Sequence, residues 1–267
     1  MLYEASRLPH WDLPSPLAAV YGGDLGFTEP CVYGNFVASI DGVVALGPEH
    51  PSSGSAISAG EPADRFVMGL LRACADTVLI GAGTLRATPG HRWTPDHVCP
   101  AAAADFADLR RSLCRAPEPE LVVVTARGDL PLEHPALQAG ALVATSSTGA
   151  RRLAGRLPDA CAIVVVAEGP GLRMAEVLTA ISVHGRRHGR MTLLVEGGPR
   201  LFGQLIAGGL VDELFLTEAP VLAGRADVAR PGLVSGVELL PHQAASAELI
   251  SVRQHGSYLF LRYRLSA

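Results

Sequence analysis

Short apolar runs alternate with segments of helical spacing along most of the chain. Runs such as residues 121–125 (Leu-Val-Val-Val-Thr) have the uninterrupted apolar character of buried parallel strands. Between the runs, apolar residues recur every three or four positions, as they do across residues 61–75, which predicts helices. The strands predicted in this way are residues 31–38, 77–80, 121–125, 141–145, 162–167, 191–195 and 213–218.

The remaining pattern completes an α/β architecture. Two extended segments at 247–253 and 257–265 meet at a turn and predict a closing antiparallel hairpin. The other predicted helices are residues 101–115, 148–157, 172–184 and 201–208, whereas 48–60 and 88–100 are predicted loops, and a short extended piece is expected at 43–46. This alternation predicts a three-layer fold, with a mostly parallel central sheet covered on both faces.

The domain organisation follows from composition. Residues 1–29 are rich in Pro and Gly and have weak periodicity, which indicates an N-terminal arm, and 30–267 shows no break and is expected to be a single domain. With 48% hydrophobic residues among 267, the chain can bury a core. No uncharged apolar run reaches the ~18 residues of a membrane span, and the N-terminus does not resemble a secretory signal, so we expect a cytoplasmic protein.

Charge and composition exclude several functional classes. The net charge of −4 argues against nucleic acid as a partner, because proteins that bind nucleic acid usually carry an excess of basic residues. All 22 Lys+Arg positions are arginine, which excludes a lysine Schiff base and a Walker lysine. The five cysteines form no C-x-x-C pair and no zinc spacing, so we expect reduced thiols and no metal. His184 and His188 are four residues apart, but an exposed helix end explains them better than a metal site.

A first glycine turn follows the predicted strand 77–80. Gly81, Gly83 and Thr84 stand where a helix should begin, and backbone N–H groups at a helix start are unpaired and attract anions. Glycines would let a phosphate approach this backbone, although an ordinary tight turn explains the same residues. Arg86 occupies the third glycine position of the dinucleotide fingerprint, so an ordinary Rossmann fold is not supported.

A second glycine turn follows the predicted strand 191–195. Glu196, Gly197 and Gly198 precede Pro199, which is favoured at the first position of a helix. Two turns with unpaired N–H groups at one edge of a sheet would suit a ligand with a pyrophosphate. Separately, Thr125 and Arg127 lie at the end of another strand, where arginine could bind the extra phosphate of NADP or be a solvated loop residue.

Four segments taken in order resemble the reductase domain of bacterial riboflavin biosynthesis. They are Asn35-Phe36-x-x-Ser39-Ile40-Asp41-Gly42, Leu70-Leu71-Arg72-Ala73, Asp76-x-Val78-Leu79-x-Gly81-Ala82-Gly83-Thr84 and Val195-Glu196-Gly197-Gly198-Pro199-x-Leu201. The resemblance implies the dihydrofolate-reductase-like fold, a homodimer, and reduction of a small-molecule substrate, 5-amino-6-(5-phosphoribosylamino)uracil or a related ring compound, with NADPH.

The resemblance also implies roles for individual residues. Together with the turns above, it predicts NADPH contacts from Val37, Ala38, Gly81, Gly83, Thr84, Thr88, Thr125, Arg127, Thr145, Gly197, Gly198, Pro199, Arg200, Leu201, Phe202, Gly203 and Gln204. The predicted substrate contacts are Ser39, Arg72, Arg92 and Glu196. Asp41 or water would supply a proton, and Glu196 would orient the N–H groups of the substrate ring. A cis peptide bond is expected between the two glycines that follow Glu196.

Two departures from the family pattern fall on the substrate side. Val43 stands where many family members have lysine, and Ala87-Thr88-Pro89-Gly90 replaces an Asp-Asn-Pro-like stretch. Two alternatives therefore stay open beside the riboflavin-type reductase. One is a dihydrofolate- or pterin-type reductase, and the other is a protein that binds NADPH without turnover.

Overall fold

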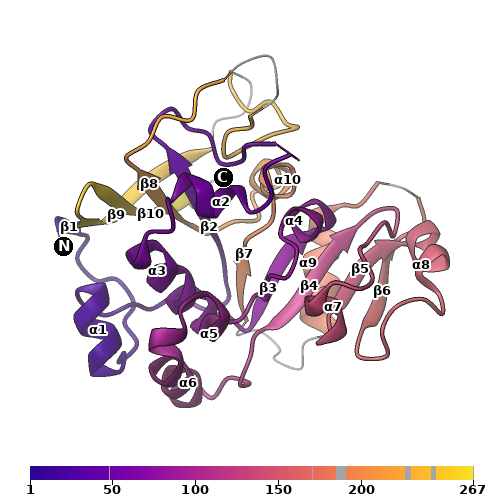
Figure 1. Ribbon diagram of the computed structural model, residues 1–267, viewed down its shortest axis with the longest axis horizontal. Coiled ribbons are helices and arrows are strands. Elements are labelled where there is room, and N and C mark those ends of the chain that lie inside the picture. The colour runs from indigo at the N-terminus through magenta and orange to yellow at the C-terminus, as the bar shows by residue number, and fades with distance from the viewer. Residues whose placement is uncertain (48, 170, 185–190, 226–229, 242–244, 267) are drawn as a thin grey trace.

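The computed structural model describes residues 1–267 except 48, 170, 185–190, 226–229, 242–244 and 267 (Figure 1). The strands are β1 (Tyr3–Glu4), β2 (Cys31–Ser39), β3 (Thr77–Gly81), β4 (Glu120–Thr125), β5 (Leu142–Ser146), β6 (Ala162–Ala167), β7 (Thr192–Val195), β8 (Glu213–Ala219), β9 (Ser246–His255) and β10 (Tyr258–Ser266). The helices are α1 (Ser15–Tyr21), α2 (Ser53–Ile57), α3 (Pro62–Ala73), α4 (Ala82–Ala87), α5 (Pro95–Val98), α6 (Ala103–Ser112), α7 (Pro135–Gln138), α8 (Ser147–Leu153), α9 (Met174–His184) and α10 (Pro199–Ala207), with a 3₁₀ turn at Pro100–Ala102.

The strands form one sheet in the order β1-β9-β10-β8-β2-β7-β3-β4-β5-β6. All neighbours from β8 to β6 run parallel, and β10, β9 and β1 extend the sheet in antiparallel fashion. The predicted mostly parallel sheet and closing hairpin are therefore confirmed. The carboxyl ends of β2, β7, β3, β4 and β5 consequently meet at one edge, where ligands bind in sheets of this kind.

Each face of the sheet is covered by its own hydrophobic core. Because side chains alternate along a strand, Val78 and Ile80 of β3 pack into one core and Leu79 packs into the other. The first core is closed by α1, α3, α6 and α7, and the second by α9 and α10 (Figure 1). These three layers are the predicted architecture. Of the helices described, none is both long and apolar enough to span a bilayer.

The first 29 residues pack onto the sheet and its helices. Strand β1 pairs with β9, and Leu17 and Tyr21 of α1 are buried in the first core. The guanidinium of Arg253 on β9 donates to the Tyr21 carbonyl at 2.9 Å and lies over the Tyr21 ring. This segment therefore contributes side chains to the same core as the rest of the chain.

The structure differs from the predicted elements mainly in the loops. Residues 43–46 form no strand, because Val43 turns back so that its amide bonds the Ser39 hydroxyl and its side chain enters a small cluster with Val37 and Ile57. The predicted loop at 48–60 contains α2, whose Ile57 closes that cluster. Helices α5 and α7 were not predicted either, since four-residue helices that begin at proline show too little periodicity.

Candidate functional site

The two glycine turns lie side by side at the carboxyl edge of the sheet. Strands β3 and β7 are hydrogen-bonded neighbours, and the Glu196 amide continues the ladder to the Leu79 carbonyl at 3.1 Å. A Cβ atom built on Gly198 would lie 3.4 Å from Thr84 Oγ1. Figure 1 shows the helices that follow these turns, α4 and α10, next to each other above this edge. The turns therefore meet across one narrow gap.

The backbone of these turns is accessible in the way that a bound anion requires. A Cβ atom on Gly83 would have nothing within 4 Å, so the space beside it is open. Neither α4 nor α10 has a side-chain N-cap, whereas α8 is capped by Ser146, whose hydroxyl accepts from the Gly149 amide at 3.1 Å. The cis peptide bonds of the described residues precede Pro30 and Pro241. The expected cis bond between Gly197 and Gly198 is therefore wrong.

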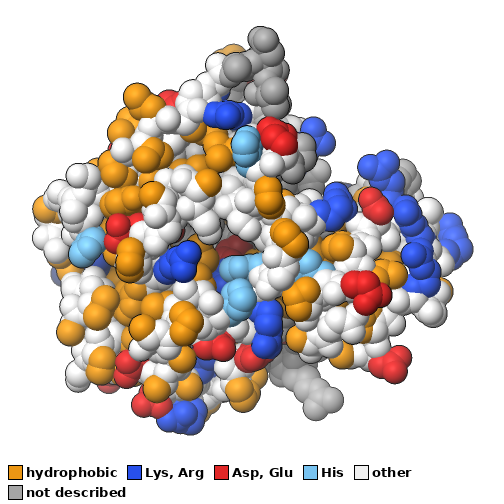
Figure 2. Space-filling view, viewed as in Figure 1, with side chains coloured by type: hydrophobic (Ala, Val, Ile, Leu, Met, Phe, Trp, Pro, Cys, Tyr) orange, Lys and Arg blue, Asp and Glu red, His pale blue; other side chains and the backbone are white. Residues whose placement is uncertain are grey.

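A cavity of about 360 Å³ opens beside the glycine turns, between α2, α3, α4 and the ends of β2 and β7. Of the predicted NADPH contacts, six line it, namely Val37, Thr84, Thr88, Gly197, Gly198 and Pro199. Figure 2 shows a hollow in the middle of this face with histidine side chains beside it, and His91 and His97 are part of the cavity wall. The volume suits a small organic ligand.

A buried ion pair forms one wall of the cavity. Arg72 Nη2 donates to Glu196 Oε2 at 2.6 Å, and Arg72 Nε donates to both carboxylate oxygens at 3.1 and 3.2 Å. The two side chains are only 1% and 8% exposed. Arg72 Nη1 donates to the carbonyls of Arg92 and Thr94, each at 3.3 Å. Arg72, the predicted contact of a substrate phosphate, thus directs these N–H donors at other groups of the protein. The Glu196 side chain, in contrast, lines the cavity.

His91 completes this network as an acceptor. Its Nε2 lies 2.9 Å from Arg72 Nη2, and since the guanidinium can only donate, Nε2 carries no proton and Nδ1 does. Burial, together with the positive charge of Arg72, lowers the pKa of His91 to about 3. His91 is therefore neutral at physiological pH and lines the cavity without a charge.

A second acid, Asp64, also lines the cavity and was not predicted. It lies in the first turn of α3, is 5% exposed, and accepts hydrogen bonds from the hydroxyls of Ser58 and Thr217. Burial is the main cause of a raised pKa for this carboxyl group, and the negative charge of Glu196 adds to it. A carboxyl group with a raised pKa inside a cleft is a candidate for acid–base chemistry.

The sequence contained a signal for this acid. Asp64, Met68 and Arg72 are spaced by four residues on α3 and form one stripe, and all three line the cavity. Arg65 stands beside this stripe, lines the cavity and is exposed. Within the described part of the chain its guanidinium makes no hydrogen bond or ion pair, so it is available to an anionic ligand.

Most of the predicted contacts along α10 lie away from the cavity. Leu201 and Phe202 are buried in the second core, where the Phe202 ring lies 4.6 Å from that of Phe36. A Cβ atom on Gly203 would lie 2.7 Å from the Ser235 carbonyl, so this glycine permits a close backbone approach. Arg200 and Gln204 are exposed. Only the first turn of α10 therefore faces the open gap.

The predicted contacts after β4 and β5 lie farther along the same edge. Thr125 and Thr145 are buried, and the Thr145 hydroxyl donates to the Thr125 carbonyl at 2.6 Å, which ties the two strand ends together. Arg127 is exposed. Among the described residues its guanidinium has no hydrogen-bond or ion-pair partner. Ala38, the last but one residue of β2, and Gly81, the last residue of β3, lie at this edge without lining the cavity.

Asp41 and Ser39 form a turn rather than part of the cavity wall. The Ser39 hydroxyl donates to Asp41 Oδ1 at 2.6 Å, and the amides of Ala223 and Gly224 donate to the same carboxylate at 2.9 Å each. The hydrogen bond from Ser39, followed by that from Ala223, lowers the pKa of Asp41 to about 2. Asp41 therefore stays ionised and fastens two loops together, which is unsuited to donating a proton.

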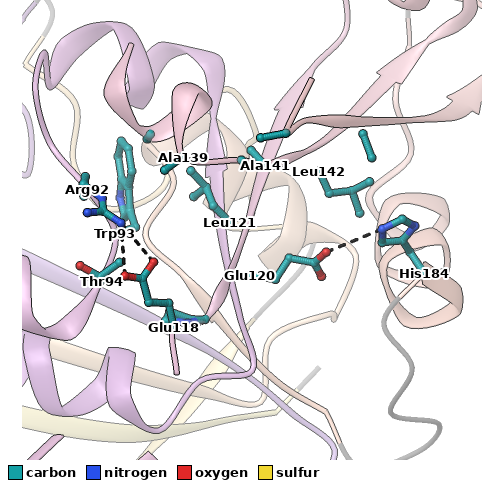
Figure 3. Close-up of a pocket in the computed structure, with 15 residues that line it drawn as sticks. Arg92, Trp93, Thr94, Glu118, Glu120, Leu121, Ala139, Ala141, Leu142 and His184 are labelled. Carbon is teal, nitrogen blue, oxygen red and sulfur yellow. Dashed lines mark hydrogen bonds and ion pairs between the residues drawn. The ribbon is translucent and has the colours of Figure 1, made fainter. Parts of the chain in front are cut away.

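The side chain of Arg92 belongs to a different cavity, shown in Figure 3. This cavity of about 310 Å³ lies at the opposite, amino edge of the sheet, where β4 and β5 begin. Its charged groups pair with one another: Arg92 donates to Glu118 at 3.1 Å, and His184 lies 3.7 Å from Glu120. Within the described residues, no group of three or more side chains could hold a metal ion. His188 lies outside those residues.

Taken together, these features define a small-molecule cleft at the carboxyl edge of an α/β sheet, whose wall contains the second glycine turn and two acids, Glu196 and Asp64. The sequence profile of the RibD C-terminal domain matches residues 30–258, and the chain belongs to this family. The predicted family and fold are therefore confirmed. No curated protein matches the sequence.

Solved structures share this fold at low sequence identity. RibD of Acinetobacter baumannii superposes with a TM-score of 0.66 at 19% identity over 89% of this chain and 58% of its own, so this chain spans little more than half of that protein. A pyrimidine reductase-like protein from Corynebacterium diphtheriae gives 0.65 at 22% identity, covering 94% and 98% of the two chains. The riboflavin biosynthesis reductase Rib7 of Saccharomyces cerevisiae superposes with a TM-score of 0.61 at 16% sequence identity, over 96% of this chain and 100% of its own.

Proposed function

We propose that the protein is an NADPH-dependent reductase of the riboflavin-pathway type. The proposed substrate is 5-amino-6-(5-phosphoribosylamino)uracil or a related ring compound, and residues 30–267 would form the reductase domain, with 1–29 packed against it. The observation that carries the proposal is the meeting of two glycine turns beside a cavity lined by two acids. Two of the similar structures, RibD and a riboflavin biosynthesis reductase, support the same assignment.

The glycine turns fit a dinucleotide cofactor. The open space at Gly83, the narrow gap at Gly198 and the uncapped helix starts would accept a diphosphate, with the Thr84 hydroxyl as a further donor. Arg127, which is exposed at the same edge, would select the 2′-phosphate of NADPH over NADH. When bound, NADPH supplies the hydride, and the chain orients the acceptor and excludes water.

The rest of the cavity would hold the substrate. Glu196, fixed by Arg72, would accept hydrogen bonds from the N–H groups of a pyrimidine-like ring. Arg65 at the rim, rather than Arg72 or Arg92, would meet an anionic group of the substrate, because its guanidinium is exposed while Arg72 is buried and Arg92 pairs with Glu118. A homodimer and a cytoplasmic location complete the proposal.

A dihydropterin-type reductase is the second candidate, and one observation favours it. Asp64 is a buried acid in the ring-binding part of the cavity, where it would contact the N–H groups of a pterin. Both candidates predict reduction of a carbon–nitrogen double bond in a nitrogen-rich ring compound or its ribosyl imine.

The test is a turnover assay with purified protein. NADPH absorbance is followed with the aminouracil ribosyl phosphate and, separately, with a dihydropterin. Oxidation of NADPH with the first substrate supports the proposed function, and oxidation with the dihydropterin alone supports the second candidate. NADPH binding without oxidation by either substrate contradicts both and leaves a protein that binds the cofactor without turnover.

A further inference from the structure

Two acids share the cavity, but their partners differ. Glu196 receives three N–H bonds from the Arg72 guanidinium and is held in a buried ion pair. Asp64 receives hydrogen bonds from the hydroxyls of Ser58 and Thr217, and among the described residues it has no ion pair. Neighbouring acids in unlike surroundings commonly divide the roles of proton carrier and fixed charge between them.

The surroundings of Asp64 hold it in place and keep water away. Asp64 is 5% exposed, and both hydroxyl partners are 2% exposed. Ser58 follows α2 and Thr217 lies on β8, so three separate elements fix the carboxyl group. It is nevertheless part of the wall of the cavity, so a ligand there would meet it directly.

Two negatively charged residues near Asp64 favour the neutral form of its carboxyl group. Glu196 and Glu61 both raise the pKa of Asp64, although burial is the larger cause. Arg72 on the same helix stripe is paired with Glu196, and Arg65 is exposed. The histidines of the cavity, His91 and His97, have lowered pKa values because of burial, so they bring no positive charge at neutral pH.

This inference rests on the proposed reductase function. We propose that Asp64 is the catalytic acid that donates the proton consumed when a carbon–nitrogen double bond is reduced in this cavity. A C=N bond takes up one hydride at carbon and one proton at nitrogen as its π bond breaks. NADPH, which becomes NADP⁺, is the source of the hydride, and the Asp64 carboxyl group gives the proton and becomes a carboxylate.

The other acids of the site are unsuited to this step. Asp41 lies outside the cavity and has a pKa lowered to about 2 by its hydrogen bonds to Ser39 and two amides. Glu196 is bound to a guanidinium that would have to be left unpaired if Glu196 carried the proton. After the proton leaves Asp64, the hydroxyls of Ser58 and Thr217 stabilise the new carboxylate.

The experiment compares Asp64→Asn with Asp108→Asn, a matched change of an exposed acid on α6. NADPH affinity is measured by nicotinamide fluorescence, and kcat and KM are measured across pH with the substrate that the wild-type protein turns over. Asp64→Asn should lower kcat by about 10²–10⁴-fold with unchanged NADPH affinity, since this is the usual contribution of a general acid. Asp108→Asn should behave as wild type.

Two further readouts separate a proton donor from a structural acid. In wild type, the rate should fall at high pH as Asp64 loses its proton, and infrared difference spectra against Asp64→Asn should show the C=O stretch of a protonated carboxyl group that disappears over the same pH range. Thr217→Val removes a hydroxyl that stabilises the carboxylate, so both transitions should move to higher pH.

The outcomes are distinct. Loss of kcat in Asp64→Asn with intact NADPH binding, together with the shift in Thr217→Val, supports the inference. Wild-type turnover that Asp64→Asn retains with an unchanged pH profile overturns it and leaves the proposed function standing. A wild-type protein that binds no NADPH, or binds it without turnover, overturns the proposed function and this inference with it.

Discussion

Replacement of Arg72 by methionine would test whether the cavity wall depends on a buried charge pair. The change would leave the Glu196 carboxylate, 8% exposed, without its guanidinium, and the carbonyls of Arg92 and Thr94 without a donor. Removing one partner of a buried ion pair costs about 3–5 kcal/mol, because the remaining charge stays buried without compensation. We therefore expect the free energy of unfolding of Arg72→Met to fall by about this amount.

The assay is urea unfolding at pH 7, with Arg264→Met as the matched control. Arg264 pairs with Glu248 at 3.0 Å, but the two side chains are 46% and 62% exposed, so this loss should be about 0–1 kcal/mol. The melting temperature of Arg72→Met should fall by about 6–20 °C, at about 2–4 °C per kcal/mol for a chain of this size. The double variant with Glu196→Gln should recover part of the loss, because no uncompensated charge is left.

Equal destabilisation by Arg72→Met and Arg264→Met would show that the buried pair contributes no more than an exposed one. Such a result would mean that water or a rearranged side chain neutralises Glu196 at little cost, and the wall of the cavity would not depend on this pair.

Three other predictions follow from single contacts. Burial and the charge of Arg72 lower the pKa of His91 to about 3 in the folded protein, whereas in the unfolded chain the ordinary histidine pKa of about 6.5 applies. Between about pH 6.5 and pH 3 the proton therefore binds mainly to the unfolded chain, and the free energy of unfolding falls as the pH falls through this range. His91→Gln, which keeps an acceptor but gains no proton, should lose less stability between pH 7 and pH 5 in urea unfolding. Arg127→Met should weaken NADPH binding by about 1.5–3 kcal/mol, or about 10–150-fold, and leave NADH binding unchanged in fluorescence titrations, whereas equal loss for both cofactors would contradict the 2′-phosphate assignment. A Cβ atom on Gly34 would lie 2.5 Å from Cε2 of the fully buried Phe202 ring, so Gly34→Ala should destabilise the protein by about 1–3 kcal/mol in the same assay, and a neutral effect would show that the ring moves freely.

The fold could be predicted where the pattern is both local and regular. The parallel strands β3, β4 and β7 are uninterrupted apolar runs, and their carboxyl ends necessarily share an edge, so the glycine turns after β3 and β7 were expected to be near each other. The structure places them on hydrogen-bonded neighbours. By contrast, α1 escaped prediction because its burial depends on partners far along the chain, such as Arg253 on β9.

The site was harder to predict because roles depend on what else a side chain contacts. Arg72 stands in a motif, but its donors are directed at Glu196, His91 and two carbonyls of a loop that carries no periodicity. The family resemblance alone implies a proton-donating role for Asp41, and only the fold shows that its carboxylate accepts hydrogen bonds from the amides of Ala223 and Gly224. The sequence alone does not distinguish Asp64 from other acids, because a single acid in the first turn of a helix is common and stabilises that turn on its own.

The proposed function depends above all on the two glycine turns together holding one diphosphate. Isothermal titration with NADPH tests it most directly, with wild type compared with Gly83→Val and with Gly171→Val, a control glycine whose Cβ would also meet nothing within 4 Å. We expect wild type and Gly171→Val to bind NADPH alike, and Gly83→Val, whose side chain fills the open space beside the turn, not to bind. Equal binding by all three proteins would contradict it.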